Sequence, residues 1–441
     1  MPAPPPTSEG SATTPGTATR DDAGAGPSTA APPVAGEAIA SEAVGDPAHA
    51  APPRSLPRRL LSRCKPHRVV YTLRWFLGEW RRMADRRREQ RVTVAVDVTP
   101  LWESLTGVGW YLERLLVHLA GRDDLRLRLY GPTVTVDPND PGPVQPLPTG
   151  PALEPVRIVV PEDLTVPAGP LIRVLRRLEP LLIAADGNRV LWAPNFFPPR
   201  RFLLARGALV ATVHDLAWRR LPWTLREETL ADLSLRLEQT AYRARYLVTP
   251  SRAVRGELAA AGIATPEQVL AIHHGPGHLS DGAGTAARAA GESGLDGPYV
   301  LFVGTIEPRK NLGTLLAAWR LLAGQHRGAA GDELPRLVVC GRVGWKSERL
   351  AERLREGEAS GWVVHLGYVE TERLEALYRG AVGLAFPTFY EGFGLPALEA
   401  MAAGIPLVLS DIPVLREVAG DAALYAPPEE PAAWARQVAR L

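Results

Sequence analysis

Cysteine is scarce in this chain of 441 residues, with Cys64 and Cys340 far apart and in unlike contexts. That pattern excludes a disulfide framework and indicates a reducing compartment. Long apolar runs are also missing, since none approaches the ~20 residues that a helix needs to cross a bilayer. The N-terminal residues lack the apolar segment of a signal peptide. We therefore expect a cytoplasmic protein, whose only membrane link would be peripheral attachment at the inner face.

An excess of charge of one sign is missing too. The 50 lysines and arginines against 48 acidic residues leave a net charge of +2, so we expect no nucleic-acid partner. Basic charge is concentrated in residues 58–91, where apolar side chains recur every three or four residues, as on one helical face, at Val69, Leu73, Phe76, Trp80 and Met83. Two interpretations of this basic amphipathic arm are equally supported. It binds an anionic membrane surface, or it packs on the fold with a solvated arginine face. A nucleic-acid-binding arm is a weaker third, because no recognition motif accompanies the charge.

The remaining chain divides by composition. Residues 1–57 are rich in proline and alanine and predict a disordered tail. Short apolar runs that alternate with helical patterns predict two doubly wound Rossmann-like domains of the α/β class, at residues 92–275 and 299–441. Residues 276–298, rich in glycine and alanine, predict a linker between them.

Within the first domain, three local predictions follow from glycine and proline. Gly107 and Gly109 predict a loop ahead of a helix over residues 110–120. The proline-rich residues 132–170 predict a surface excursion. A short helix over residues 171–178 is expected to end before Pro180.

The most informative stretch is PTFYEGFGLPALEAMAAGIPLVLS, residues 387–410. It follows an apolar run, residues 382–386, and predicts a loop, a helix over residues 395–403 and another strand. Loops at the carboxyl ends of parallel strands are where open α/β sheets bind ligands. Glu391 and Glu399 have seven residues between them, and a carboxylate accepts paired hydrogen bonds from the vicinal hydroxyls of a sugar.

This stretch resembles the signature of the GT-B, family-4-type retaining glycosyltransferases, among them mannosyltransferases. The resemblance extends over roughly residues 92–441 and is strongest after residue 299. It implies a GT-B fold, in which two Rossmann-like domains face each other across a cleft.

The resemblance also implies roles for individual residues. His214, in TVHDLA, and Glu391 match catalytic positions, whereas Arg309 and Lys310, in GTIEPRKN, match the motif that binds the donor diphosphate. The other implied donor-binding residues lie in the two glycine loops and the following helix: Gly107, Gly109, Gly392, Phe393, Gly394, Leu395 and Glu399. Adjacent cations suit a leaving diphosphate because they stabilise its developing charge.

The resulting hypothesis is an enzyme that transfers a sugar from a nucleoside diphosphate sugar, with GDP-mannose as the best guess, to a glycan or lipid-linked acceptor. The family implies retention of configuration, a role in polysaccharide or glycoconjugate biosynthesis, and neither metal nor cofactor. Two alternatives are a GT-B-shaped UDP-sugar epimerase and an inactive binding module. The adjacent His273 and His274 predict only a turn, because no third metal ligand accompanies them.

Overall fold

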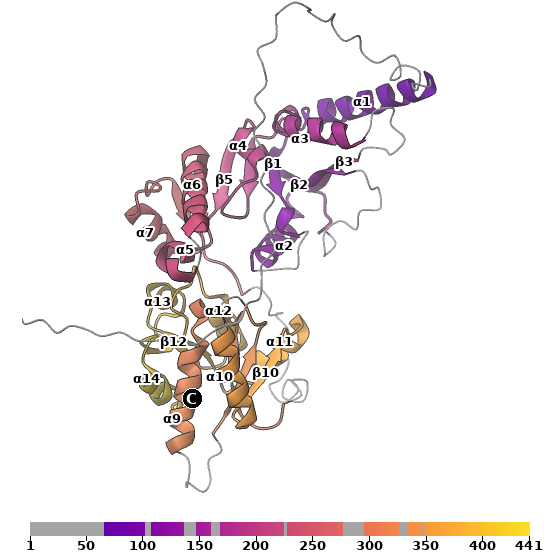
Figure 1. Cartoon of the computed structure of the whole chain (residues 1–441). Helices are drawn as coiled ribbons and strands as arrows, with labels where there is room; N and C mark the ends of the chain where they lie inside the picture. The colour runs from indigo at the N-terminus through magenta and orange to yellow at the C-terminus, as the bar shows by residue number, and fades with distance from the viewer. Residues whose placement is uncertain are drawn as a thin grey trace, which may run out of the picture. The chain divides into compact units, whose positions relative to one another are not determined.

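The computed structural model describes residues 66–101, 107–135, 147–159, 168–224, 227–276, 295–325, 334–344 and 347–441. The predicted tail and most of the predicted linker lie outside these residues. The described part contains two parallel sheets, whose elements follow the chain by colour in Figure 1. The predicted α/β class is confirmed.

The first sheet has the strand order β3-β2-β1-β4-β5-β6-β7 in the described residues. Its strands are β1 (Val92–Asp97), β2 (Leu125–Thr135), β3 (Leu153–Val159), β4 (Val190–Ala193), β5 (Ala208–Thr212), β6 (Ala244–Thr249) and β7 (Val269–Ala271). The connecting helices are α2 (Gly107–Leu119), α3 (Ala168–Ala185), α4 (Arg200–Leu204), α5 (Ala217–Arg220), α6 (Glu227–Arg243) and α7 (Arg252–Ala260), with 3-10 turns η2 (Thr99–Leu101) and η3 (Pro222–Thr224). Ahead of them lies α1 (Pro66–Arg86), which confirms a helix in the basic segment.

The second sheet has the order β10-β9-β8-β11-β12-β13. Its strands are β8 (Tyr299–Val303), β9 (Arg336–Cys340), β10 (Val363–Gly367), β11 (Gly383–Phe386), β12 (Leu407–Ser410) and β13 (Leu424–Ala426). The connecting elements are η4 (Pro308–Lys310), α9 (Leu312–Gln325), α10 (Glu348–Ala359), α11 (Thr371–Gly380), α12 (Leu395–Ala403), α13 (Pro413–Ala419) and α14 (Pro431–Val438). Cys340 is buried at the end of β9, as its apolar context predicts.

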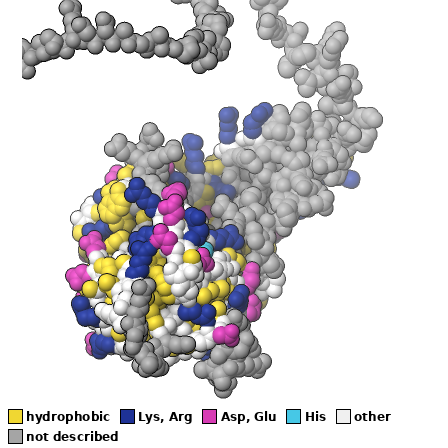
Figure 2. All heavy atoms as spheres, turned by 60° about the horizontal axis from the view of Figure 1, so that its bottom comes forward, with side chains coloured by type: hydrophobic (Ala, Val, Ile, Leu, Met, Phe, Trp, Pro, Cys, Tyr) yellow, Lys and Arg dark blue, Asp and Glu magenta, His cyan; other side chains and the backbone are white. Residues whose placement is uncertain are grey.

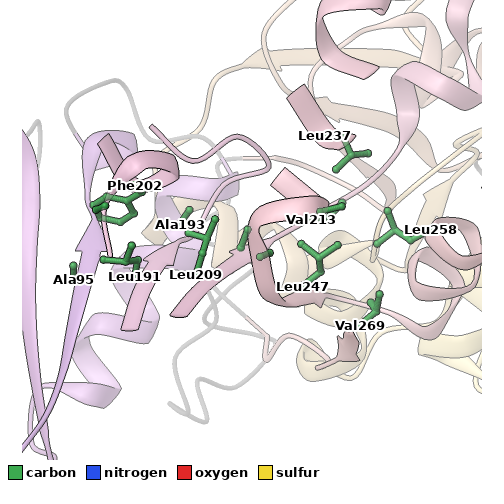
Figure 3. Close-up of a cluster of buried hydrophobic side chains, with 14 of the residues drawn as sticks. Ala95, Leu191, Ala193, Phe202, Leu209, Val213, Leu237, Leu247, Leu258 and Val269 are labelled. Atoms are coloured by element: carbon green, nitrogen blue, oxygen red, sulfur yellow. The ribbon is translucent and has the colours of Figure 1, made fainter. Parts of the chain in front are cut away.

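Each sheet is held by apolar side chains on its strands and helices. In the first sheet, Leu191, Leu209 and Leu247 on β4, β5 and β6 belong to one buried cluster, drawn in Figure 3. In the second sheet, Phe302 on β8 packs in a cluster with Trp319 on α9. Both faces of these parallel strands are covered, which explains why their sequences read as continuous apolar runs.

In each sheet the direction in which successive strands are added reverses once. In the second sheet the chain moves outward from β8 to β9 and β10, and then returns to the other side of β8 with β11. The loops after β8 and β11 therefore leave the sheet side by side and in opposite directions. This topological switch point is where doubly wound sheets bind ligands.

Three local predictions in the first domain are wrong. Residues 132–170 contain the end of β2 and all of β3, and Pro155 is tolerated because β3 is an edge strand. Helix α3 continues through Pro180 to Ala185. Gly107 and Gly109 lie in the first turn of α2 instead of a loop before it.

Candidate functional site

The loops after β8 and β11 bring the predicted cations and Glu391 together. Arg309 and Lys310 end the single turn η4, and the amide of Phe389 donates to the Arg309 carbonyl at 2.9 Å. The Asn311 side chain then donates to the carbonyl of Pro387 at 2.9 Å. These two hydrogen bonds fix the two loops to each other at the switch point.

Glu391 is the centre of a buried ion cluster. Its Oε1 accepts from Lys310 Nζ at 2.7 Å and from Thr388 Oγ1 at 2.9 Å, and it lies 3.1 Å from Arg309 NH1. Burial alone would raise the pKa of the Glu391 carboxyl, but the charges of Lys310 and Arg309 lower it overall. Glu391 is therefore ionised and holds both cations in place.

Burial and pairing set the state of the two cations. Burial lowers the pKa of Lys310, although the Glu391 charge opposes that shift. The pKa of Arg309 is raised because Glu391 and Glu307 outweigh its burial, and its NH2 lies 2.7 Å from Glu307 Oε1. The side chains of Arg309 and Lys310 remain 21% and 11% exposed, so an anion can still reach them.

Glu399 is held by a different partner. It lies in the second turn of α12 and is 3% exposed, and its Oε2 accepts from Tyr378 Oη at 2.6 Å. Burial raises the pKa of the Glu399 carboxyl, against the hydrogen bond from Tyr378 and the charge of Lys310. Glu399 is thus electrostatically coupled to Lys310, as expected for one shared site.

The loop before α12 needs its glycines for two different reasons. Gly394 has a φ of 92°, the left-handed conformation that glycine adopts without strain, and starts α12. A Cβ on Gly392 would lie 1.9 Å from the carbonyl oxygen of His214. Gly392 is therefore required for the close approach between this loop and the end of β5, and Ser251 Oγ donates to its carbonyl at 2.8 Å.

His214 follows β5 and is oriented by a backbone carbonyl. Its Nε2 lies 2.7 Å from Pro194 O, which can only accept, so Nε2 carries the proton. Burial lowers the pKa of His214, against the Pro194 hydrogen bond and the Asp215 charge. The imidazole is therefore neutral, and the lone pair of Nδ1 is the atom that can accept a hydrogen bond.

An aromatic group surrounds His214. The ring of Tyr111, on α2, lies 5.0 Å from that of His214 and 4.9 Å from that of His274. Phe393, from the loop before α12, lies 5.0 Å from His274. Burial lowers the pKa of His274 from 6.5 to about 3, with smaller contributions from His214 and His273. Elements of both sheets thus meet around two neutral imidazoles.

Comparison with known proteins places this arrangement in a family. Residues 285–441 match the model of the family described as Glycosyl transferases group 1. The O-antigen chain mannosyltransferase B of Escherichia coli is 33% identical over 283 residues, which cover 59% of this chain and 71% of that protein. The chain belongs to the glycosyl transferases group 1 family.

Two further proteins extend the comparison. The serotype-specific mannosyltransferase WbdA of Escherichia coli is 31% identical over 281 residues, 60% of this chain but 33% of that protein. Sucrose-phosphate synthase from Thermosynechococcus elongatus aligns with a TM-score of 0.58 and 21% identity, covering 79% of this chain and 89% of that chain. The structural likeness confirms the predicted GT-B fold of the glycosyltransferase.

Four of the predicted site residues of this glycosyltransferase, Arg309, Lys310, Glu391 and Glu399, share one region of the matched part. Phe393 is buried, and its ring lies 5.0 Å from that of His274. Leu395 is partly buried at the start of α12. Gly107 is exposed, and a Cβ there would meet nothing within 4 Å, so no packing contact requires it.

The sequence alone did not identify two residues of the site. Tyr378 lies near the end of α11, in a segment without a motif, and only the fold brings it to Glu399. For His274 the sequence predicts only a turn. Its neighbour His273 has a separate contact, with Nε2 2.6 Å from Glu417 Oε1. Among the described residues, no group of three His, Cys, Asp or Glu side chains is arranged to hold a metal ion.

Proposed function

We propose that this glycosyltransferase moves mannose from GDP-mannose to a glycan or lipid-linked acceptor, in the assembly of an O-antigen-like polysaccharide. Two relatives named as mannosyltransferases, at 33% and 31% identity, support the sugar. Their names also favour transfer over the epimerase alternative. The ion cluster of Arg309, Lys310 and Glu391 at the switch point carries the proposal that a charged donor binds here.

The cations would bind the diphosphate of the donor. Arg309 is paired with Glu307 and Lys310 with Glu391, and both cations are only partly exposed. A bound phosphate would therefore share the hydrogen-bond donors of each cation with its carboxylate, and neither side chain would have to move. Such fixed charges stabilise the leaving group as negative charge develops on it. In this proposal Glu391 has two roles, since it orients Lys310 and lies next to the sugar and phosphate.

Glu399 would accept hydrogen bonds from the ribose hydroxyls of the nucleotide. Its hydrogen bond from Tyr378 fixes the carboxyl group, and a hydrogen bond to a charged group contributes about 1.5–3 kcal/mol. Gly392 and Gly394 would let the backbone approach the phosphate. The start of α12 adds the positive end of its helix dipole.

Retention of configuration would follow from attack on the face that the diphosphate leaves. The bond between the anomeric carbon and the phosphate oxygen breaks, and its electron pair stays on that oxygen. The acceptor hydroxyl forms the new bond and gives its proton to the departing phosphate. His214 would position the donor sugar by accepting a hydrogen bond at Nδ1, because its neutral ring has no second proton to donate.

The test is turnover by the full chain with a panel of donors. GDP-mannose, GDP-glucose, UDP-glucose and UDP-galactose are offered with a mannose-terminated lipid-linked oligosaccharide, and the product is analysed by mass and by anomeric NMR signals. We expect mannose transfer from GDP-mannose to give an α-linked product from the α-linked donor. Transfer only from a UDP-sugar, a β-linked product, or UDP-sugar epimerisation without acceptor would overturn the proposal.

A further inference from the structure

Helix α1 carries an apolar stripe that the described fold leaves exposed. Val70, Leu73, Leu77 and Trp80 recur at the three- and four-residue spacing of one helical face, with Phe76 beside them. Leu73 is 57%, Leu77 54% and Trp80 68% exposed. Exposed apolar groups of this size on one helical face mark an interaction site.

The opposite face of α1 attaches the helix to the fold. Glu79 is buried, and Arg86 Nε donates to Glu154 Oε1 on β3 at 3.0 Å. Arg86 also donates to Asp186 at 3.2 Å, just after α3. The stripe is therefore presented outward by a helix whose last turn is fixed. The sequence left membrane binding and packing on the fold as alternatives. The structure shows attachment to the fold on one side of α1 and an exposed apolar stripe on the other.

Helix α3 has a second exposed stripe. Val174, Leu178 and Leu181 are exposed at helical spacing, whereas Ile183 is buried in the core. The ends of the two helices meet, because Arg87, the residue after α1, donates to the carbonyl of Ala185 at the end of α3. Figure 1 shows both helices in the same region of the molecule. The two exposed apolar stripes thus lie on helices whose ends are in contact.

The charge around these stripes is basic. Arg74 and Arg81 are exposed on α1, and Arg173 and Arg177 are exposed on α3. A hollow at the base of α1 is lined by five arginines and three carboxylates, among them Arg88 and Arg126. On the face shown in Figure 2, by contrast, basic and acidic side chains are interspersed. The apolar stripes thus lie among arginines.

We propose that α1, together with α3, docks this enzyme on an anionic lipid bilayer, with the apolar stripe of α1 lying in the plane of the interface. Apolar helical faces with aromatic residues and flanking arginines bind such surfaces. No described helix is both long enough and apolar enough to cross a bilayer. A second copy of the chain is the less suitable occupant, since a symmetric contact would bring arginines against arginines. This inference goes beyond the proposed transfer and does not depend on it.

The experiment is flotation of the full chain with phosphatidylcholine vesicles, with and without phosphatidylglycerol. We expect binding that requires phosphatidylglycerol and weakens as salt is raised. The double variant Leu73→Ser/Leu77→Ser should lose vesicle binding, and Arg74→Glu/Arg81→Glu should weaken it by about fivefold or more per arginine. The matched control is Leu235→Ser, because Leu235 on α6 is similarly exposed at 55%.

Two measurements keep the outcomes separate. Thermal melts should show that all variants fold as the wild type does, and size-exclusion chromatography with light scattering should show no change of oligomeric state. Binding that ignores the α1 substitutions, equal binding to uncharged vesicles, or an oligomer that dissociates in Leu73→Ser/Leu77→Ser would overturn the proposal. A variant in α3, Leu178→Ser/Leu181→Ser, should weaken vesicle binding as well. Full vesicle binding by this variant would show that α3 is not part of the membrane-binding surface.

Discussion

The ammonium group of Lys310 lies 2.7 Å from Oε1 of Glu391, and the two side chains are only 11% and 9% exposed. A buried pair of this kind is costly to break, because the remaining charge loses its partner but stays out of water. Arg309 and Thr388 complete the hydrogen bonding of the carboxylate. The same ion cluster therefore contributes both to the stability of the second domain and to the proposed chemistry of the site.

Glu391→Gln should lower both stability and activity. The amide keeps the shape but leaves Lys310 without its counter-ion, so we expect a loss of about 3 kcal/mol in the free energy of unfolding. Turnover should fall by about 10²-fold or more, since the cations are no longer fixed. Denaturant unfolding and donor turnover check the two effects. Glu356→Gln is the control, because Glu356 forms an exposed pair with Arg320 and its loss should cost under about 1 kcal/mol.

The two carboxylates of the motif should affect stability in opposite ways as pH changes. The folded-state pKa of Glu391 lies below its ordinary 4.5, so its stabilisation is present above pH 4.5 and is lost as pH falls through the folded pKa. The pKa of Glu399 is raised above 4.5, so its contribution to stability falls as pH rises above 4.5. Unfolding free energies of Glu391→Gln and Glu399→Gln, measured against wild type from pH 3 to 8, should diverge with opposite slopes. Parallel curves would contradict this assignment.

Gly392→Ala should damage the contact between the two domains. Its Cβ would lie 1.9 Å from the His214 carbonyl oxygen, so backbone must shift, at a cost of about 1–3 kcal/mol. Gly256→Ala is the matched control, because a Cβ on that helical glycine meets nothing within 4 Å. The control should gain about 0.5–1 kcal/mol. Equal effects in thermal melts of the two variants would show that the close approach is absent in solution.

Tyr378→Phe should weaken donor binding through Glu399. Removing the hydroxyl takes away the hydrogen bond that Tyr378 donates to the buried carboxyl at 2.6 Å, at a cost of about 1–3 kcal/mol in stability. The KM for the donor should rise more than kcat falls, because the lost contact orients a binding group. In a double-mutant cycle with Glu399→Gln the two effects should not add. Strict additivity would indicate that the tyrosine acts elsewhere.

His274 should make the protein sensitive to mild acid. Its pKa is about 3 in the fold and 6.5 ordinarily, so the unfolded chain binds more protons between those values and stability falls as pH drops below 6.5. His274→Asn should flatten the stability curve between pH 6.5 and 4. A curve as steep as that of wild type would show that this imidazole is accessible to protons in the folded state.

The sequence predicted those structural features that depend on residues close together in the chain. The stretch around Glu391 and Gly394 implies a loop at a strand end followed by a helix, and the structure has that order. The predictions from proline failed because the energetic cost of a proline depends on its position. Pro155 lies in an edge strand, where the ladder can lack one amide hydrogen bond. Tyr378 and His274 could not be found from sequence, since long-range packing alone brings them to Glu399 and His214.

The most direct test of the central claim is the stabilisation of the full chain by GDP compared with UDP, in wild type and in Lys310→Met. At a nucleotide concentration of 100 times the dissociation constant, binding should add about 2.7 kcal/mol to wild-type stability. We predict that GDP stabilises wild type more than UDP does, and that Lys310→Met loses most of this gain, whereas Arg320→Met, at an exposed helix position, keeps it. Equal stabilisation of wild type and Lys310→Met by GDP would contradict a donor diphosphate bound at this cluster.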